Sequence, residues 1–295
     1  MKGGCDKLKD KFTFLVVGGD KRQIFLAKQL LADGHTVYSF ATERYEFEDD
    51  IKQLSINEFS KADIIIFPTP TEREKGLLNA PLCNTFYKTS VILDAISPKT
   101  IVFAGGISNQ MYNRAKRNDI LLYDYINRDD FAIGNAISTC EGALQIAINE
   151  MPITLHGANV LVIGNGRIGS MLSYYLKALH ANVTVSARSN KDFALIKAHG
   201  MKYVNTNLLI GKLWDFNLII NTVPACVLGL CELSEINDNC VIIDLASKAG
   251  GVDFKSAEKL GKHAIHALSL PGKVAPISAA NVIKDTIYTI LQEEI

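Results

Sequence analysis

The sequence feature that most constrains the fold is a glycine-rich turn that joins an apolar run to a helical segment. Residues 160–163 read Val-Leu-Val-Ile, and Gly164-x-Gly166-x-x-Gly169 follows at once. In such a turn the first glycine permits the bend, the second lets the backbone approach a pyrophosphate, and the third lets the helix pack on the strand. The helix N-terminus, with Arg167 and Ile168, adds free N–H groups and partial positive charge. The pattern predicts a dinucleotide-binding unit.

The residue after the next strand indicates which dinucleotide is bound. An apolar strand is expected over residues 182–187, and Arg188 stands at its end. NAD-binding folds usually place Asp or Glu there, whereas a basic residue suits the 2′-phosphate of NADP. Arg188 and Ser189 offer donors and no carboxylate, so NADP(H) is favoured over NAD(H). Further cofactor contacts are expected at the end of a later buried strand, from Asn221, Thr222 and Pro224.

The N-terminal half repeats this arrangement. Gly18 corresponds to Gly164 and Val37 to Val183 at one constant offset, and the buried runs 62–70 and 216–224 both end in a proline-bearing loop. However, Gly18-Gly19-Asp20 has no third glycine and puts an acid where a phosphate would lie. The first half is therefore expected to be Rossmann-like in shape without being the cofactor site.

These elements predict an α/β protein with two tandem doubly wound Rossmann-like domains and a cleft between them. We expect residues 1–130 to form a substrate domain that a C-terminal helix, 278–295, completes. Residues 131–152 should form an interdomain helix, and 153–277 the NADP-binding domain. The stretch 270–276 is expected to be a loop.

Composition is that of a soluble globular protein. The 295 residues carry 31 basic and 31 acidic side chains, so nothing favours nucleic acid or an anionic membrane as a partner. Residues 1–11 read as a charged leader without an apolar signal segment. The six cysteines are scattered without metal-ligand spacing, which favours reduced thiols in a cytoplasmic protein and no metal site.

Ligands of open α/β sheets bind outside the carboxyl ends of the strands, so polar residues at those ends are the site candidates. Several are cations or hydroxyls, which suit a substrate with carboxylates; alternatively they are solvated charges and helix caps. The expected substrate-binding residues are Arg22, Thr69, Thr71, Ser138 and Lys273. The expected catalytic residues are Ser247, Lys248, Thr139 and Glu141. No strong acid–base pair is evident, and the proton carrier stays open.

Several longer motifs carry a family resemblance. Among them are Thr-Leu-His-Gly at 154–157, Ile-Asp-Leu-Ala-Ser-Lys-Ala-Gly-Gly-Val-Asp-Phe at 243–254 and Leu-Pro-Gly-Lys-Val-Ala-Pro at 270–276. Together with the glycine turn they resemble the A subunit of dipicolinate synthase over nearly the whole chain, from about Phe12 to Ile290. The last two motifs are far more specific than the glycine turn.

The resemblance implies an NADP-dependent oxidoreductase in the mother-cell cytoplasm of a spore-forming bacterium. Such an enzyme oxidises dihydrodipicolinate, from a branch of the lysine pathway, to pyridine-2,6-dicarboxylate, and works with a flavoprotein-like second subunit. The two substrate carboxylates agree with the hydroxyls and cations above. This sequence departs from the family pattern at Ser138, Cys140, Asn165 and Lys273, where the family usually has Pro, Ala, Leu and a hydrophobic residue.

Two other functions remain open. One is another two-domain NAD(P)-dependent dehydrogenase, of the 2-hydroxy-acid or methylene-tetrahydrofolate type. The other is a non-catalytic NADP-binding sensor or assembly subunit. The sequence also leaves open the oligomeric state, a homo-oligomer included, and whether the substrate is the dihydro compound or its hydroxylated tetrahydro precursor.

Overall fold

The computed structural model describes residues 8, 10–74, 76–246 and 250–294. These residues divide into two compact units, described separately below. The N-terminal unit contains the described residues of Met1–Asn135 and Ala275–Ile295, and the C-terminal unit consists of those of Ala136–Val274.

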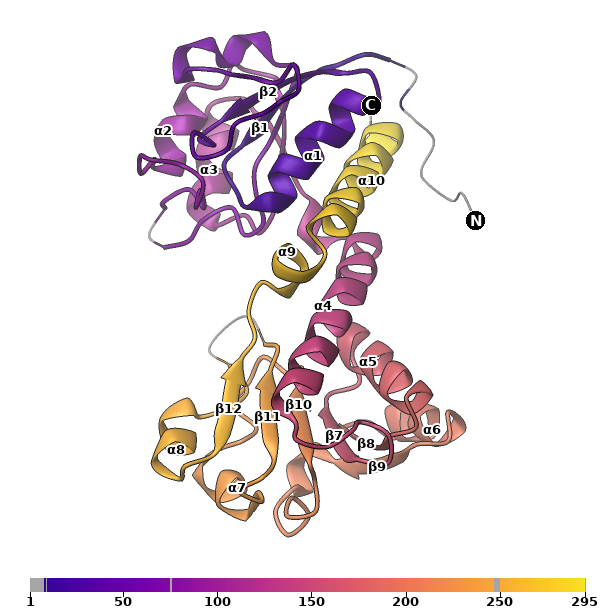
Figure 1. Ribbon diagram of the computed structural model, residues 1–295. Coiled ribbons are helices and arrows are strands. Elements are labelled where there is room, and N and C mark those ends of the chain that lie inside the picture. The colour runs from indigo at the N-terminus through magenta and orange to yellow at the C-terminus, as the bar shows by residue number, and fades with distance from the viewer. Residues whose placement is uncertain (1–7, 9, 75, 247–249, 295) are drawn as a thin grey trace. The chain divides into compact units, whose positions relative to one another are not determined.

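The N-terminal unit is built on a parallel sheet with the strand order β3-β2-β1-β4-β5-β6 (Figure 1). Its elements along the chain are β1 (Thr13–Val17), α1 (Lys21–Ala32), β2 (Thr36–Phe40), β3 (Lys52–Gln53), η1 (Ile56–Lys61), β4 (Ile64–Ile66), α2 (Thr89–Asp94), β5 (Ile101–Ala104), α3 (Asn109–Arg117), β6 (Leu121–Asp124), η2 (Tyr125–Asn127) and the final helix α10 (Pro276–Glu294).

The C-terminal unit has the same strand order, β9-β8-β7-β10-β11-β12, again in a parallel sheet. The long helix α4 (Asp129–Glu150) crosses the division between the units. It is followed by β7 (Asn159–Ile163), α5 (Arg167–Ala178), β8 (Asn182–Ala187), α6 (Asn190–Ala198), β9 (Lys202–Asn205), η3 (Thr206–Leu208), β10 (Leu218–Asn221), α7 (Leu230–Glu235), β11 (Val241–Asp244), α8 (Phe254–Lys259), β12 (His263–His266) and α9 (Leu270–Val274). Two sheets in the doubly wound order confirm the predicted fold class.

Each sheet is covered by helices on both faces, which explains the uninterrupted apolar runs of its central strands. Residues 64–66 in β4 and 218–220 in β10 are completely buried. In the N-terminal unit α1 and α10 pack on one face and α2 and α3 on the other. In the C-terminal unit α4, α5 and α6 cover one face, and α7 and α8 the other. Strands buried on both sides cannot alternate polar and apolar residues.

The expectation of a loop at 270–276 is wrong, because Leu270–Val274 forms the short helix α9. Pro271 stands in the first turn of α9, where a helix needs no N–H from the residue and tolerates proline. Gly142 of α4 gives the turn room. A Cβ at Gly142 would lie 3.0 Å from the Cβ of Leu270.

Helix α10 belongs to the core of the N-terminal unit although it comes last in the chain. Ile283, Ile287 and Tyr288 are buried beside residues of α1 and β1. Polar contacts fix the helix as well, since Lys284 Nζ and Tyr288 Oη donate to Asp33 Oδ2 at 2.7 and 3.1 Å. No helix among the described residues is both long and apolar enough to span a membrane.

The burial of Ile287 gives a test of how much this unit depends on α10. We expect Ile287→Ala to lower the free energy of unfolding by about 2–5 kcal/mol, because it leaves a cavity among packed side chains. Ile277, in the first turn of the same helix, is 53% exposed, so Ile277→Ala should change it by less than about 0.5 kcal/mol. Urea unfolding followed by circular dichroism measures both, and equal effects would contradict the assignment.

Candidate functional site

The glycine turn after β7 is shaped by close contacts that only glycine permits. Gly164 has φ +101°, and a Cβ there would lie 2.5 Å from Thr222 Oγ1. A Cβ at Gly169 would lie 2.1 Å from the carbonyl oxygen of Gly164. Gly166 differs, because a Cβ there would meet nothing within 4 Å. Two glycines are therefore required by packing, and the third keeps open space in front of the turn.

Helix α5 starts at this open space without a capping side chain. Its N-cap is Gly166, and no side chain accepts hydrogen bonds at that position. The start of a helix of this kind is suited to an anion, through its N–H groups and partial positive charge. Helix α4 supports the first turn, where the Cys140 thiol donates to the carbonyl of Ile168 at 3.6 Å. Burial raises the pKa of the Cys140 thiol to about 12, so it acts as a packing group.

A second polar group lies at the end of β8, the strand beside β7. Arg188 is exposed, and no hydrogen bond or ion pair joins it to another of the described residues. Ser189 caps α6, accepting from the backbone N–H of Asp192 at 3.1 Å and donating to its carboxylate at 2.6 Å. The other carboxylate oxygen of Asp192 accepts from Asn165 Nδ2 at 3.1 Å. The hydrogen bonds from Ser189 and Asn165 hold the pKa of Asp192 below its usual range.

The ends of β10 and β11 are fixed by a buried polar pair. Asn221 and Asp244 are both completely buried, and Asn221 Nδ2 donates to Asp244 Oδ1 at 2.8 Å. The Asp244 carboxylate also accepts from the backbone N–H groups of Ala246 and Gly251 at 3.0 and 2.7 Å. Asp244 thus holds both ends of the segment 246–251. The predicted catalytic residues Ser247 and Lys248 belong to that segment but lie outside the described residues.

The corresponding turn in the N-terminal unit is filled by its own chain. Counted from Gly18, Gln23 stands at the position that Gly169 holds relative to Gly164. A Cβ at Gly19 would lie 2.2 Å from Gln23 Cγ, and the Gly19 N–H donates to the carbonyl of Asn79 at 2.8 Å. Asp20 caps α1 by accepting from the backbone N–H of Arg22. Because of these contacts, the turn at Gly18–Asp20 lacks the open space and the uncapped helix start that suit the turn at Gly164–Gly169 for a phosphate.

Three of the predicted substrate residues, Arg22, Thr69 and Thr71, lie together in the N-terminal unit. Hydrogen bonds within the protein already occupy polar groups of all three. The Arg22 guanidinium is paired with Asp20 at 2.9 and 2.8 Å and donates to the Thr69 carbonyl at 2.7 Å. Thr71 is completely buried, and its hydroxyl lies 3.1 Å from both the N–H and the carbonyl oxygen of Gly105. Arg22 and Thr71 therefore support the loop around the cis Thr69–Pro70 bond.

The remaining predicted residues are distributed over the helices and loops of the second half. Ser138 and Thr139 are buried in α4, and Glu141 is exposed on the same helix. Lys273 is exposed on α9, and Pro224 is exposed in the loop after β10. Thr222 donates to the carbonyl of Ile163 at 2.8 Å, so it ties the β10 loop to the strand that carries the glycine turn.

Asp192 and Asn165 were not among the residues predicted to bind the cofactor. A local signal was present for Asp192, because Ser189-x-x-Asp192 before an apolar run is the pattern of a helix cap. The partnership with Asn165 had no sequence signal, since 27 residues separate the two side chains. The only sequence signal for Gln23 was that it stands where the glycine pattern would have its third glycine.

Comparison with known proteins identifies the family. Residues 13–126 match the family model for the N-terminal domain of the dipicolinate synthase A subunit. The dipicolinate synthase A subunit of Bacillus subtilis (strain 168) is 34% identical over 290 residues, covering 94% of this chain and 95% of that protein. The designation of that relative as the A subunit implies a further subunit.

Solved structures agree with this relationship. The crystal structure of the dipicolinate synthase A subunit from Bacillus halodurans has a TM-score of 0.85 and 32% identity, covering 95% of this chain and 97% of that chain. The transhydrogenase from Sinorhizobium meliloti shares the fold at a TM-score of 0.70 and 16% identity, covering 95% of this chain and 93% of that chain. With the two Rossmann-like units and the glycine turn, these matches establish that the chain belongs to the family of dipicolinate synthase A subunits.

Proposed function

We propose that this chain oxidises dihydrodipicolinate to pyridine-2,6-dicarboxylate with NADP⁺ as hydride acceptor. The observation that supports this most directly is the open glycine turn at Gly164–Gly169 with the exposed Arg188 beside it, in a chain of the dipicolinate synthase family. The closed turn at Gly18–Asp20 supports a single dinucleotide site, in the C-terminal unit.

The residues at the carboxyl ends of β7, β8 and β10 fit the proposed cofactor. Gly166, Arg167 and Ile168 would present backbone N–H groups to the pyrophosphate, together with the partial charge of α5. Arg188 would pair with the 2′-phosphate. Asn221 and Thr222 would act by fixing the β10 loop, because their side chains already bond within the protein. The bound dinucleotide supplies the hydride acceptor.

The proposed substrate carries two carboxylates, which hydroxyl and cationic side chains would recognise. Thr69, Ser138 and Lys273 remain the proposed direct contacts. Arg22 has two of its guanidinium nitrogens engaged by Asp20 and Thr69, so it would contribute through the remaining one. Thr71 is proposed to position the 68–71 loop, because its buried hydroxyl is bonded to Gly105.

The chemical step requires loss of a hydride and a proton from the dihydropyridine ring. Because the product ring is aromatic, the oxidation is strongly favourable, and a strongly activated base is not required. We propose that the proton leaves through one of the residues expected to be catalytic, which are Thr139, Glu141, Ser247 and Lys248. We also propose that the chain works with a flavoprotein-like second subunit, in the mother cell during sporulation.

The reaction is tested by generating the substrate in place. Aspartate semialdehyde, pyruvate and dihydrodipicolinate synthase are supplied with this chain and NADP⁺, with and without the second subunit. We expect pyridine dicarboxylate and NADPH to form in a one-to-one ratio, followed by absorbance. Bound NADP⁺ without product in either mixture would instead support the sensor or assembly function. NADPH formed from a 2-hydroxy acid or methylene-tetrahydrofolate would support the other dehydrogenases.

The two kinds of glycine in the turn should respond differently to substitution. Gly169→Ala should weaken NADP⁺ binding and also destabilise the protein by about 1–3 kcal/mol, because the new methyl group overlaps the Gly164 carbonyl. Gly166→Ala should lower stability by less than about 1 kcal/mol, since it loses only the preference for Gly over Ala at an N-cap. It should nevertheless weaken NADP⁺ at least about tenfold, because its methyl group enters the open space. Calorimetric titration and thermal unfolding separate the two effects. Undiminished NADP⁺ binding by Gly166→Ala would place the pyrophosphate elsewhere.

The role of Arg188 in cofactor choice is tested by charge reversal. Arg188→Asp should weaken NADP⁺ by about 10- to 100-fold, the value of about 1.5–3 kcal/mol for a hydrogen bond to a charged group. NAD⁺ has no 2′-phosphate, so its affinity should change by less than about twofold on the same scale. Dissociation constants for both dinucleotides measure the effect. An equal loss for both would rule out the 2′-phosphate assignment.

A further inference from the structure

The hydrogen bond between Asn165 and Asp192 joins the glycine turn after β7 to the first turn of α6. Asn165 lies within the glycine turn after β7, and Asp192 lies in the first turn of α6, after β8. The two strands are neighbours, with Ile163 opposite Ser186, and the Gly164 N–H donates to the Ser186 carbonyl at 3.0 Å. In this fold the adenosine ribose of a dinucleotide lies near the end of the second strand, which here is the end of β8 beside the glycine turn.

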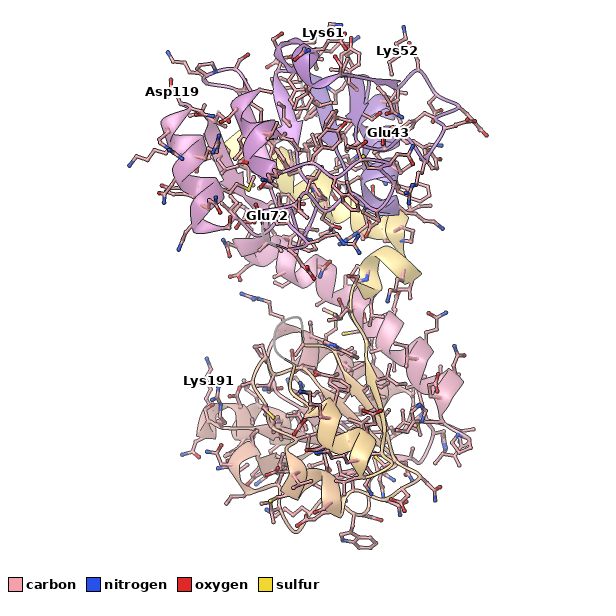
Figure 2. All side chains as sticks on the ribbon, turned by 90° about the vertical axis from the view of Figure 1, so that its left-hand side faces the viewer. Glu43, Lys52, Lys61, Glu72, Asp119 and Lys191 are labelled. Atoms are coloured by element: carbon pink, nitrogen blue, oxygen red, sulfur yellow. The ribbon has the colours of Figure 1, made fainter. Side chains whose placement is uncertain are left out.

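Asp192 brings a carboxylate to this place, although the residue at the end of β8 is Arg188. Both carboxylate oxygens are held, one by Asn165 and the other by Ser189, so the charge is fixed in position. An aspartate carboxylate is ionised at neutral pH, and the same hydrogen bonds lower the pKa of Asp192 further. Lys191, beside it on α6, is exposed and extends from the surface of the unit (Figure 2).

We propose that Asp192 is a specificity-determining residue that reduces the preference for NADP⁺ over NAD⁺. This inference rests on the proposed dinucleotide site. The 2′-phosphate of NADP⁺ carries a charge of about −1.5 to −2 at neutral pH, as other phosphomonoesters do. A fixed carboxylate beside it repels that charge, while the 2′-hydroxyl of NAD⁺ is neutral. Arg188 and Asp192 therefore act in opposite directions on the same group.

Isothermal titration of the full-length protein with NADP⁺ and with NAD⁺ tests the proposal. Asp192→Asn keeps the shape of the side chain and can still accept from Ser189, while it removes the charge. We expect it to tighten NADP⁺ by about 3- to 10-fold, the range for partly screened charges a few ångströms apart. NAD⁺ should change by less than about twofold. The gain should shrink in 0.5 M NaCl, because salt screens exposed charges.

Two further variants separate charge from geometry. Asn165→Leu removes the hydrogen bond but keeps the carboxylate, so it should alter the ratio of the two affinities less than Asp192→Asn does. Asp238→Asn is the matched control. Asp238 is exposed, paired with Lys262, and precedes β11, so it lies at the amino ends of the strands, whereas the glycine turn follows the carboxyl end of β7. Its substitution should leave both affinities unchanged.

The outcomes distinguish this inference from the proposed function. If the unaltered protein binds neither dinucleotide, the proposed function fails. If it binds NADP⁺ but Asp192→Asn leaves that affinity unchanged or weaker, or changes both dinucleotides by one factor, only the role of Asp192 fails. An equally large change of the ratio in Asn165→Leu would assign the effect to loop geometry and overturn the role of the charge.

Discussion

The close approach of α5 to β7 is the constraint on which the candidate site depends. The backbone at Gly169 comes so near the Gly164 carbonyl that a methyl group at Gly169 would overlap it. This approach brings the start of α5 to the carboxyl end of the sheet, and Gly166 then leaves the space before it open. Within the same turn, Asn165 donates a hydrogen bond to Asp192 in the first turn of α6.

The N-terminal unit shows what the same topology becomes when that constraint is removed. Its strand order matches that of the C-terminal unit, and the Gly18 N–H donates to the Phe40 carbonyl just as the Gly164 N–H donates to Ser186. Gln23 stands in place of the third glycine, and its side chain fills the turn. The Gly19 N–H is taken up by a hydrogen bond to the carbonyl of Asn79. The two turns therefore differ in their local packing, although the strand order of the two sheets is the same.

Several polar side chains in the second half are hydrogen-bonded within the protein and fix its loops. Asn221 was expected to contact the cofactor. Its amide donates to Asp244, and the Asp244 carboxylate also accepts from the backbone N–H groups of Ala246 and Gly251. A buried carboxylate needs such donors, because an unsatisfied charge in the interior is costly. This pair therefore fixes Ala246 and Gly251, while Ser247 and Lys248 lie outside the described residues.

The sequence by itself determined the fold class and the position of the glycine turn, because apolar runs of strand length and the spacing of glycines are local properties of the chain. It also located β8 and the exposed Arg188 at its end. Only the tertiary structure decided which polar side chains are already hydrogen-bonded within the protein. Thr71 and Arg22 look available in the sequence yet are bonded to Gly105, Asp20 and Thr69, and Asp192 meets Asn165 only because β7 and β8 are neighbours. Hydrogen-bond partners distant in sequence are set by strand order and packing, which no local pattern encodes.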